Sequence, residues 1–220
     1  MRIAIIGGHG KVALLAVPLL VADGHEVTGM IRDPDQADEV AAAGATPVVA
    51  DVEALDAAAL GEVLDGHEAV VWAAGAGGGN PSRTYAVDRD AAIGSMEAAA
   101  RVGIDRYVMV SYFGAGPDHG VPEDSSFFPY AEAKAAADEH LRGTELAWTI
   151  LGPSRLTDDP GTGAIEVGEG VTGSSVPRPD VARVISAVLD QPATAGSTIA
   201  FNGGDTPVDE AIDRIATRRG

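Results

Sequence analysis

Residues 1–13 read MRIAIIGGHGKVA and decide the fold of this chain. Arg2–Ile6 is a short apolar run rich in branched side chains, which predicts a buried strand. The glycines in residues 7–10 predict a turn that is too tight for residues with a Cβ atom. Across residues 11–21 the apolar side chains recur at helical spacing, so a helix follows the turn. Pro18 lies inside this helix and is expected to bend it or to loosen one turn.

This succession of strand, turn and helix predicts a phosphate-binding site. The first turn of a helix leaves backbone N–H groups without partners inside the helix, and these groups attract an anion. Gly7, Gly10 and Ala13 match the dinucleotide-binding fingerprint, with alanine in the place where helix and strand pack closely. A tight turn in another kind of α/β protein would use the same glycines. Because the turn directly follows the first strand, we favour the cofactor interpretation.

Three further residues of this turn are candidates for contact with the cofactor phosphates. His9 and Lys11 can each place a donor there, and Val12 lies in the first helical turn, where backbone N–H groups are free. Lys11 is one of only two lysines among 15 basic residues. An exposed position at the start of a helix explains Lys11 equally well.

The composition excludes several classes of protein. The chain has 220 residues, 45% of them hydrophobic, which suits one domain with a three-layer core and argues against disorder. It has no cysteine, hence no disulfide and no thiol nucleophile. A formal charge of −18 disfavours nucleic acid as a partner through repulsion. No apolar run approaches the about 18 residues of a membrane span, and no signal peptide precedes the first strand. We therefore expect a cytoplasmic protein that contacts no membrane. We also expect a monomer or a homodimer.

Beyond the first unit, strands and helices continue to alternate. This alternation predicts a doubly wound, parallel, Rossmann-like sheet with helices on both faces, in a single domain over residues 1–220. The expected strands are Arg2–Ile6, Glu26–Ile31, 46–50, 69–73, Arg106–Val110, 146–151, Ala164–Val167 and 198–202. The expected helices are 11–21, 36–43, 53–64, 85–102, 129–142, 179–189 and 208–218.

The end of the second strand bears on cofactor specificity. NAD-specific sites usually place an acidic residue there, about 20 residues beyond the glycine turn, to bind the ribose 2′-hydroxyl. Here the strand ends without an acid, and Arg32 follows it. A guanidinium binds a 2′-phosphate through two parallel charge-assisted hydrogen bonds. We therefore expect NADP(H) to be preferred over NAD(H); the alternative is that Arg32 only pairs with Asp33 or Asp35.

A serine, a tyrosine and a lysine predict a catalytic site. Tyr130 and Lys134 are four residues apart, which puts the phenol and the ammonium on one face of a helix. The ammonium is expected to lower the pKa of Tyr130 and make it an acid or base near neutrality. Ser111 lies at the carboxyl end of a predicted strand, where ligands gather in such sheets, and its hydroxyl can hold a substrate carbonyl. The alternative is a surface helix that happens to carry a tyrosine.

A metal site is not expected. The five histidines, at positions 9, 25, 67, 119 and 140, are scattered without the spacing of metal ligands. Residues 158–161, Asp-Asp-Pro-Gly, have the composition of a turn rather than of a catalytic carboxylate pair.

Together these stretches resemble the short-chain dehydrogenase/reductase superfamily. The closest likeness is to its atypical, NAD(P)H-binding, NmrA-like branch, which includes flavin- and biliverdin-reductase-type enzymes. The likeness covers nearly the whole chain, and its markers are GGHGKVALL, MIRDP, VVADVEAL, VVWAAGAG, AVDRDAAIGSMEAAARVGIDRYVMVS, YAEAKAAADEHLR and LAWTILGPSRLTDDPGTGAI. The resemblance implies a Rossmann-like fold with NADP(H) in the crevice at the carboxyl ends of the strands.

The resemblance also implies which positions contact the cofactor. Asp51 and Val52 would lie beside the adenine, and Ala73, Ala74 and Gly75 beside the ribose. Lys134 would contact the nicotinamide ribose, and the backbone at Pro153 and Ser154 would face the nicotinamide. The chain departs from the family at Gly152, where many relatives have arginine. It also departs at Pro129, which puts Tyr130 in the first helical turn.

These observations predict an NADP(H)-dependent oxidoreductase that transfers hydride to a small carbonyl, quinone or flavin-like substrate. Tyr130 would protonate the developing alkoxide, Lys134 would tune Tyr130 and hold the ribose, and Ser111 would orient the carbonyl. Residues 112–128 and 152–178 are expected to line the substrate pocket. Two alternatives remain: a non-catalytic redox sensor that binds NADP and signals through a protein partner, and a sugar-nucleotide epimerase or isomerase. The chain after the sixth strand is short for a separate substrate lobe, which weighs against the epimerase.

Overall fold

The first strand lies near the middle of a parallel sheet, as the doubly wound fold requires. The computed structural model describes residues 1–77, 80–168 and 170–217. Within them, seven strands pair in parallel in the order expected of a Rossmann-like sheet. From one edge they are β3 (Thr46–Val49), β2 (Glu26–Ile31), β1 (Arg2–Ile6), β4 (Ala69–Trp72), β5 (Arg106–Val110), β6 (Ala147–Pro153) and β10 (Ser197–Gly203). The predicted fold class is therefore confirmed.

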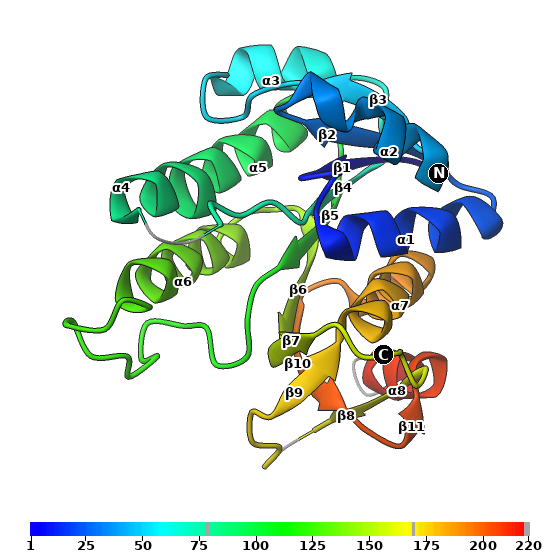
Figure 1. The fold of residues 1–220 in the computed structure, drawn as a ribbon, viewed down its shortest axis with the longest axis vertical. Coiled ribbons are helices and arrows are strands. Elements are labelled where there is room, and N and C mark those ends of the chain that lie inside the picture. Colours follow the sequence, from blue (N-terminus) through cyan, green and yellow to red (C-terminus); the bar gives the residue numbers. More distant parts are fainter. Residues whose placement is uncertain (78–79, 169, 218–220) are drawn as a thin grey trace.

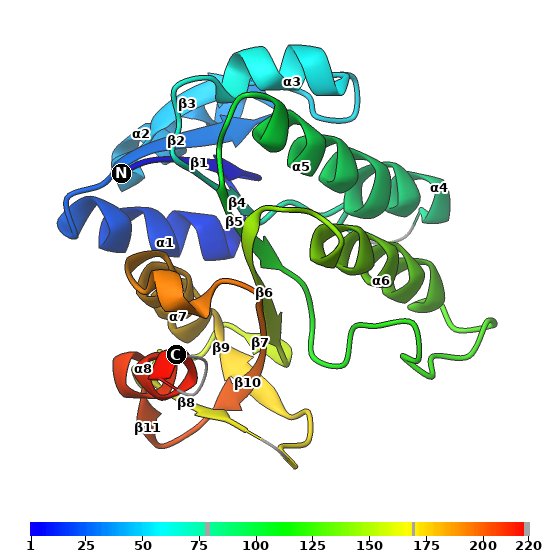
Figure 2. The ribbon, with the colours of Figure 1, turned by 180° about the vertical axis from the view of Figure 1, so that it is seen from behind.

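Helices cover both faces of this sheet (Figures 1 and 2). One layer consists of α1 (Lys11–Ala22), α2 (Ala37–Ala43), α7 (Arg178–Asp190) and α8 (Val208–Thr217). The other layer consists of α3 (Ala57–Leu64), α4 (Pro81–Thr84), α5 (Ala92–Arg101) and α6 (Phe128–Arg142). Each layer buries its own apolar core against the sheet. The strands are accordingly apolar on both faces, which explains why they appear in the sequence as continuous hydrophobic runs.

The far edge of the sheet contains more strands than the sequence predicted. The expected short strand β8 (Ala164–Val167) is present and pairs antiparallel with β10 and with β11 (Thr206–Pro207). A separate parallel pair, β7 (Arg155–Thr157) and β9 (Ser175–Pro177), lies in the expected pocket segment 152–178 and was not predicted. Strands of three residues are too short to show an alternating pattern in a sequence.

The helix expected over residues 53–64 is four residues shorter at its start. It begins at Ala57, because the Asp56 carboxylate accepts a hydrogen bond from the backbone N–H of Ala59 at 2.8 Å and caps the helix. The residues before it form a turn in which the N–H of Glu53 donates to Asp51 Oδ1 at 3.1 Å. Glu53 therefore belongs to a loop at the end of β3 and not to a helix.

The helix expected over residues 85–102 begins earlier and is not regular. It starts with α4, continues through a wide π-helical segment, η2 (Tyr85–Ala91), and ends as α5. Segments of this kind are frequent at functional sites. Here the segment carries Asp88, which is 1% exposed and accepts a hydrogen bond from the N–H of Ala76 at 3.1 Å. The helix thus holds the loop that follows β4.

Other differences are confined to element ends. A single turn, η1 (Pro34–Gln36), precedes α2, and another, η3 (Pro192–Thr194), follows α7. Helix α1 continues through Pro18, where a bend or a loosened turn was expected. Residue 218, the expected end of the last helix, lies outside the described residues. So do residues 78–79, between the expected strand 69–73 and the expected helix 85–102, and residue 169 of the expected pocket segment.

Candidate functional site

The turn after β1 is closed so tightly that its first position requires glycine. Gly7 has a φ of +87°, and a Cβ added to it would lie 2.6 Å from the backbone nitrogen of Ala74. Gly7 and Gly8 both donate their N–H groups to the carbonyl of Met30, at 3.2 and 2.8 Å. Gly10 in turn donates to the carbonyl of Gly7 at 2.9 Å. Backbone contacts to β2 and β4 therefore fix the turn, and the N-terminus of α1 opens at the carboxyl ends of the strands.

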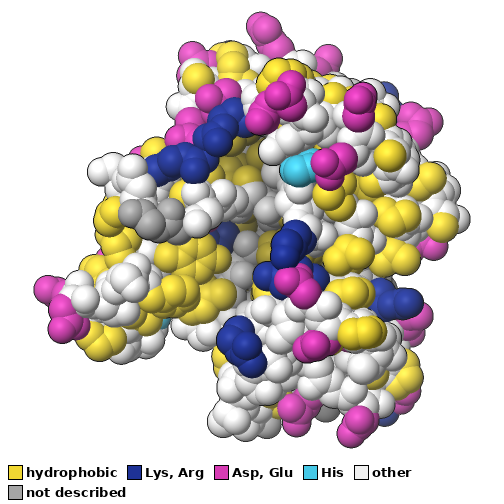
Figure 3. All heavy atoms as spheres, in the orientation of Figure 1, with side chains coloured by type: hydrophobic (Ala, Val, Ile, Leu, Met, Phe, Trp, Pro, Cys, Tyr) yellow, Lys and Arg dark blue, Asp and Glu magenta, His cyan; other side chains and the backbone are white. Residues whose placement is uncertain are grey.

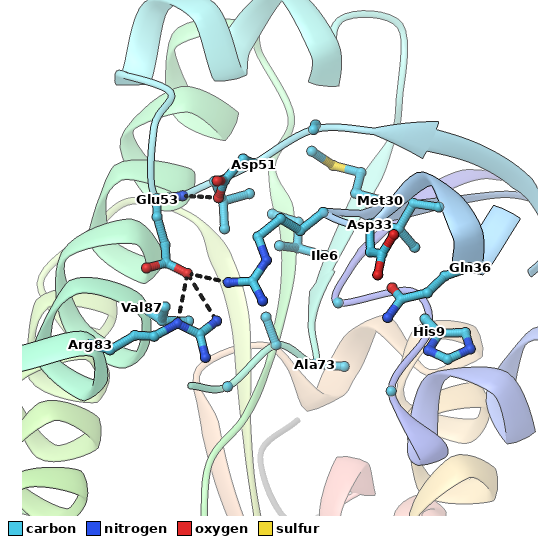
Figure 4. A pocket seen from close by; sticks show the side chains of 18 residues that line it. Ile6, His9, Met30, Asp33, Gln36, Asp51, Glu53, Ala73, Arg83 and Val87 are labelled. Atoms are coloured by element: carbon cyan, nitrogen blue, oxygen red, sulfur yellow. Dashed lines mark hydrogen bonds and ion pairs between the residues drawn. The ribbon is translucent and has the colours of Figure 1, made fainter. Parts of the chain in front are cut away.

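A cavity of about 320 Å³ lies beside this turn (Figure 4). Such a volume is within the usual range of small-molecule sites. The cavity is lined by nine of the residues predicted to contact the cofactor: Gly7, His9, Gly10, Arg32, Asp51, Val52, Ala73, Ala74 and Gly75. Five others are not part of its lining: Lys11, Val12, Lys134, Pro153 and Ser154. In the space-filling view this face is hollowed, with Lys and Arg side chains on both sides of the hollow (Figure 3).

Arg32 reaches toward a carboxylate that the sequence analysis did not predict. Its Nη1 lies 3.0 Å from Oε1 of Glu53, and Arg83 donates Nε and Nη2 to the same oxygen at 3.1 and 3.0 Å (Figure 4). Arg83 also donates Nη1 to the carbonyl of Ala76 at 2.7 Å. The sequence analysis missed Glu53 because a helix was expected to begin there. It missed Arg83 because this residue lies between the expected strand 69–73 and the expected helix 85–102.

The acid next to Arg32 has a different partner. Asp33 accepts a hydrogen bond from the N–H of Asp35 at 3.0 Å and caps η1. His9 lies on the same side of the cavity, with its Nε2 3.1 Å from Glu39 Oε2. Figure 4 shows Asp33 and His9 across the cavity from Glu53. The alternative in which Arg32 only pairs with a neighbouring aspartate is therefore not what the structure shows.

Lys11 joins the start of α1 to the segment after β6. Its Nζ lies 2.9 Å from Oδ2 of Asp158, while Arg178 donates Nη1 to Oδ1 of the same carboxylate at 2.7 Å. The hydrogen bond from Lys11 is the largest of the effects that lower the pKa of Asp158, and Arg178 adds to it. The side chains of Lys11 and Asp158 are both exposed. Lys11 thus contacts the segment 152–178 instead of the cavity.

The three predicted catalytic residues come together near the carboxyl end of β5, but two of them have internal partners. Ser111 donates its hydroxyl hydrogen to Oδ2 of Asp138 at 2.5 Å, and both side chains are buried. Lys134 is 1% exposed and donates to the carbonyl of Val110 at 2.8 Å and to the sulfur of Met109 at 3.2 Å. The sequence analysis did not predict Asp138, which lies one helical turn after Lys134.

The expected effect of Lys134 on Tyr130 is wrong. The pKa of Tyr130 is raised, first because burial disfavours the phenolate and then because Asp88 and Asp138 repel it. The ammonium of Lys134 is directed at the Val110 carbonyl, and burial lowers its own pKa despite the two aspartates. Burial raises the pKa of Asp88 and of Asp138, and Lys134 opposes that rise. Tyr130 therefore stays protonated over a wide pH range.

Tyr130 belongs to a cluster of three aromatic rings. Its ring centroid lies 5.6 Å from that of Tyr112 and 5.2 Å from that of Phe127, and Tyr112 meets Phe127 edge-on at 5.3 Å. Phe127 is 43% exposed. Among the described residues, the buried hydroxyl of Tyr112 and Oδ1 of Asp138 have no hydrogen-bond partner. Half of the chain's ten aromatic residues fall within positions 112–130, which was an available signal for this cluster.

The two predicted nicotinamide-facing positions help to fix residues 153–157 and 172–177, which we call the wall after β6. The hydroxyl of Ser154 is hydrogen-bonded to Oδ1 of Asn202, and its N–H donates to the Phe201 carbonyl at 3.0 Å. Pro153 accepts from the N–H of Phe113 at 2.9 Å. At Gly152 a Cβ would lie 3.2 Å from the carbonyl oxygen of Tyr112. This close approach explains why no arginine stands at that position.

The described residues contain neither a metal-binding group of side chains nor a membrane-spanning helix. In residues 1–77, 80–168 and 170–217, no three histidine, cysteine or acidic side chains are grouped so that they can hold a metal ion. In the same part of the chain, no helix has both the length and the apolar character needed to cross a membrane.

Comparisons with known proteins bear on the cavity beside the glycine turn. The family described as NAD(P)H-binding matches residues 7–192. The "Uncharacterized sugar epimerase YhfK" of Bacillus subtilis is 32% identical over 217 residues, which span 98% of this chain and 100% of that protein. The solved structure of a "Putative NAD-dependent epimerase/dehydratase" from Bacillus halodurans is 32% identical, with a TM-score of 0.90 over 97% of this chain and 99% of the other.

A more distant solved structure has the same fold. The anaerobilin reductase ChuY from Escherichia coli O157:H7 is 22% identical and covers 93% of this chain and 98% of its own, with a TM-score of 0.76. At that identity the likeness concerns the fold alone. The expectation of an NAD(P)H-binding protein is confirmed by the family match over residues 7–192. The glycine turn, the cavity beside it and the match over most of its length together show that this chain belongs to the NAD(P)H-binding family.

Proposed function

We propose that this protein is an NADP(H)-dependent oxidoreductase that reduces a small carbonyl, quinone or flavin-like acceptor. The observation that carries the proposal is the cavity beside the glycine turn. The side chain of Arg32, which is ion-paired with Glu53, lies on the wall of this cavity. Gly10 supports a nicotinamide cofactor here, because a Cβ at this position would lie 3.2 Å from the Gly7 carbonyl oxygen, and its absence leaves the turn open to a phosphate. Membership of the NAD(P)H-binding family supports the same cofactor.

The chain's own residues would divide the binding as follows. The backbone N–H groups at Lys11 and Val12, at the start of α1, would hold the pyrophosphate. Arg32 would bind the 2′-phosphate, and the cavity wall at Asp51 and Val52 would contact the adenine. The ribose would lie against the loop after β4, whose residues Ala73, Ala74 and Gly75 line the cavity.

The chemistry would rely mainly on Tyr130. When bound, the nicotinamide supplies the hydride, and Tyr130 would donate the proton to the reduced carbonyl oxygen. The raised pKa of Tyr130 keeps that proton in place until it is needed. Lys134 has three ammonium hydrogens, two of which have partners in the described chain, so one remains for a ribose hydroxyl. Because Ser111 donates to Asp138, we assign it to fixing α6 rather than to the substrate.

Two other functions have a specific observation in their favour. The names of the two relatives at 32% identity support an epimerase, in which the cofactor would be reduced and reoxidised within one turnover. The internal partners of Ser111 and Lys134 support a sensor that binds NADP without catalysis. Either protein would use the same nucleotide site. We further propose a cytoplasmic monomer or homodimer, because the chain's strong negative charge favours solubility.

A binding and turnover experiment separates these functions. We expect NADPH to bind more tightly than NADH in calorimetry, and we expect NADPH absorbance to fall when a carbonyl, quinone or flavin acceptor is added. Interconversion of sugar nucleotides without net loss of NADPH would replace the proposal with the epimerase. Tight binding without turnover of any acceptor or sugar nucleotide would replace it with the sensor.

A further inference from the structure

We propose that Glu53 occupies the place of the cofactor's 2′-phosphate and competes with it for Arg32 and Arg83. In this assignment Arg83 is the second cation of the phosphate site, and Glu53 sets how strongly NADP(H) is preferred over NAD(H). The inference rests on the proposed function, since it concerns the cofactor named there. It adds two specificity-determining residues that the glycine turn and Arg32 do not by themselves identify.

The geometry places one acceptor between two guanidinium groups. Oε1 of Glu53 receives Nη1 of Arg32 at 3.0 Å and both Nε and Nη2 of Arg83 at 3.1 and 3.0 Å. Three N–H groups from two directions thus converge on a single oxygen at the wall of the cavity (Figure 4). A phosphate offers three acceptor oxygens where the carboxylate offers one at this point, so it can take the same donors with better geometry.

Arg83 is held in place independently of Glu53. Its Nη1 donates to the carbonyl of Ala76 at 2.7 Å, and its backbone N–H is capped by the side chain of Asn80 at 3.2 Å. The guanidinium therefore remains at the cavity when another anion replaces the carboxylate. Within the described part of the chain, the Arg32 side chain has no second hydrogen bond of this kind, and it is 55% exposed, so it can adjust to the new anion.

Glu53 is positioned to serve as an exchangeable anion. Its backbone N–H is fixed by Asp51, while its side chain is 24% exposed and lies on a loop instead of a helix. With Glu53 in place, the three side chains carry a net charge of +1. Without the carboxylate they would carry +2, which matches a phosphate of about −1.5 to −2 charge. NAD(H), which lacks that phosphate, gains nothing from displacing the carboxylate.

The experiment measures the dissociation constants of NADP⁺ and NAD⁺ by calorimetry. The variants are Glu53→Gln, Arg83→Ala and the double variant, with Glu39→Gln as a matched control. Glu39 also lies near the cavity, but its carboxylate is 3.1 Å from His9 rather than from an arginine. NAD⁺ serves as an internal control, because a variant that disturbs the loop after β4 would weaken both nucleotides alike.

Glu53→Gln is expected to tighten NADP⁺ binding about 5- to 30-fold and to change NAD⁺ binding less than about 2-fold. The reason is that the variant loses the negative charge that competes with the 2′-phosphate for the two arginines. Arg83→Ala is expected to weaken NADP⁺ about 10- to 100-fold with NAD⁺ nearly unchanged. In the Arg83→Ala background the gain from Glu53→Gln should shrink, and Glu39→Gln should alter the two nucleotides equally.

The possible failures can be told apart. A wild-type protein that prefers NADP⁺ but shows the same preference in Glu53→Gln overturns this inference and leaves the proposed function standing. Equal tightening of both nucleotides by Glu53→Gln also overturns it, because a general charge effect would then suffice. A wild-type protein without preference overturns the NADP(H) assignment; if Glu53→Gln then creates a preference, the competition by Glu53 is supported nonetheless.

Discussion

The two ends of the candidate site, at the glycine turn and at the end of β5, are built in opposite ways. Around the glycine turn, backbone hydrogen bonds fix the structure and the side chains border a cavity. Around the end of β5, the side chains of Ser111 and Lys134 are buried and bonded to Asp138 and Val110. The first end borders an open cavity, whereas at the second end Ser111 and Lys134 already have partners inside the protein. Substitutions at the two ends can therefore test nucleotide binding and chemistry separately.

The largest effect is expected from Gly10→Val, which attacks the nucleotide end alone. The branched side chain would occupy the place of the pyrophosphate, and its Cβ would lie 3.2 Å from the Gly7 carbonyl oxygen. We expect cofactor affinity to fall by roughly 100-fold or more, with loss of all turnover. Calorimetry on the folded variant measures this. Gly94→Val is the control, because an added Cβ there meets nothing within 4 Å; unchanged affinity in Gly10→Val would place the phosphates elsewhere.

Tyr130→Phe tests the chemistry end without touching the nucleotide. If Tyr130 donates the proton, turnover of a carbonyl substrate falls by about 10² to 10⁴, while NADPH affinity is unchanged. A flavin or quinone acceptor can take hydride without that proton, and its rate should then stay the same. Tyr112→Phe is a matched control in the same ring cluster, since its hydroxyl has no partner in the described structure. Equal losses in the two variants would remove Tyr130 from its proposed role.

Ser111→Ala distinguishes a structural hydroxyl from a substrate-binding one. It removes the donor to the buried carboxylate of Asp138, so we expect the free energy of unfolding to drop by about 1–3 kcal/mol. Turnover should change less than about tenfold. Urea unfolding and steady-state kinetics measure the two quantities. Unchanged stability together with a much larger kinetic loss would mean that Ser111 binds the substrate carbonyl, as the sequence analysis predicted.

The smallest effect is expected in the pH profile. Burial, Asp88 and Asp138 raise the pKa of Tyr130 above its ordinary value of 10. The proton donor is active below its pKa and is lost as the pH rises through it. The kcat/KM of the wild-type protein for a carbonyl should therefore show no tyrosine-dependent decline between pH 7 and about 9.5. A decline near pH 8 that is missing in Tyr130→Phe would mean that the bound cofactor reverses the effect of the two aspartates.

The sequence predicted what the backbone determines locally. The glycine turn and the strands could be recognised because φ restrictions and apolar runs act over a few residues. Glu53 was assigned to a helix because the sequence alone did not reveal that this helix begins only after Asp56, which caps it. The pKa of Tyr130 was misjudged because its burial, the largest cause of the rise, and the approach of Asp88 from another helix both arise only in the folded chain. Long-range electrostatics depends on which segments meet, and a single sequence does not show this.

The order of strands along the chain has a consequence for protein synthesis. The residues that line the nucleotide cavity all lie between positions 6 and 87, so they leave the ribosome early. The wall after β6 is held by Asn202, whose side chain binds Ser174 at 2.9 Å and Thr172 at 3.0 Å. β8 likewise needs β10 as its partner. Because domains grow from the N-terminus and distant pairings form slowly, this wall is completed only after the last strands emerge. A chain that stops short of β10 would carry the full set of cavity-lining residues without a finished substrate wall.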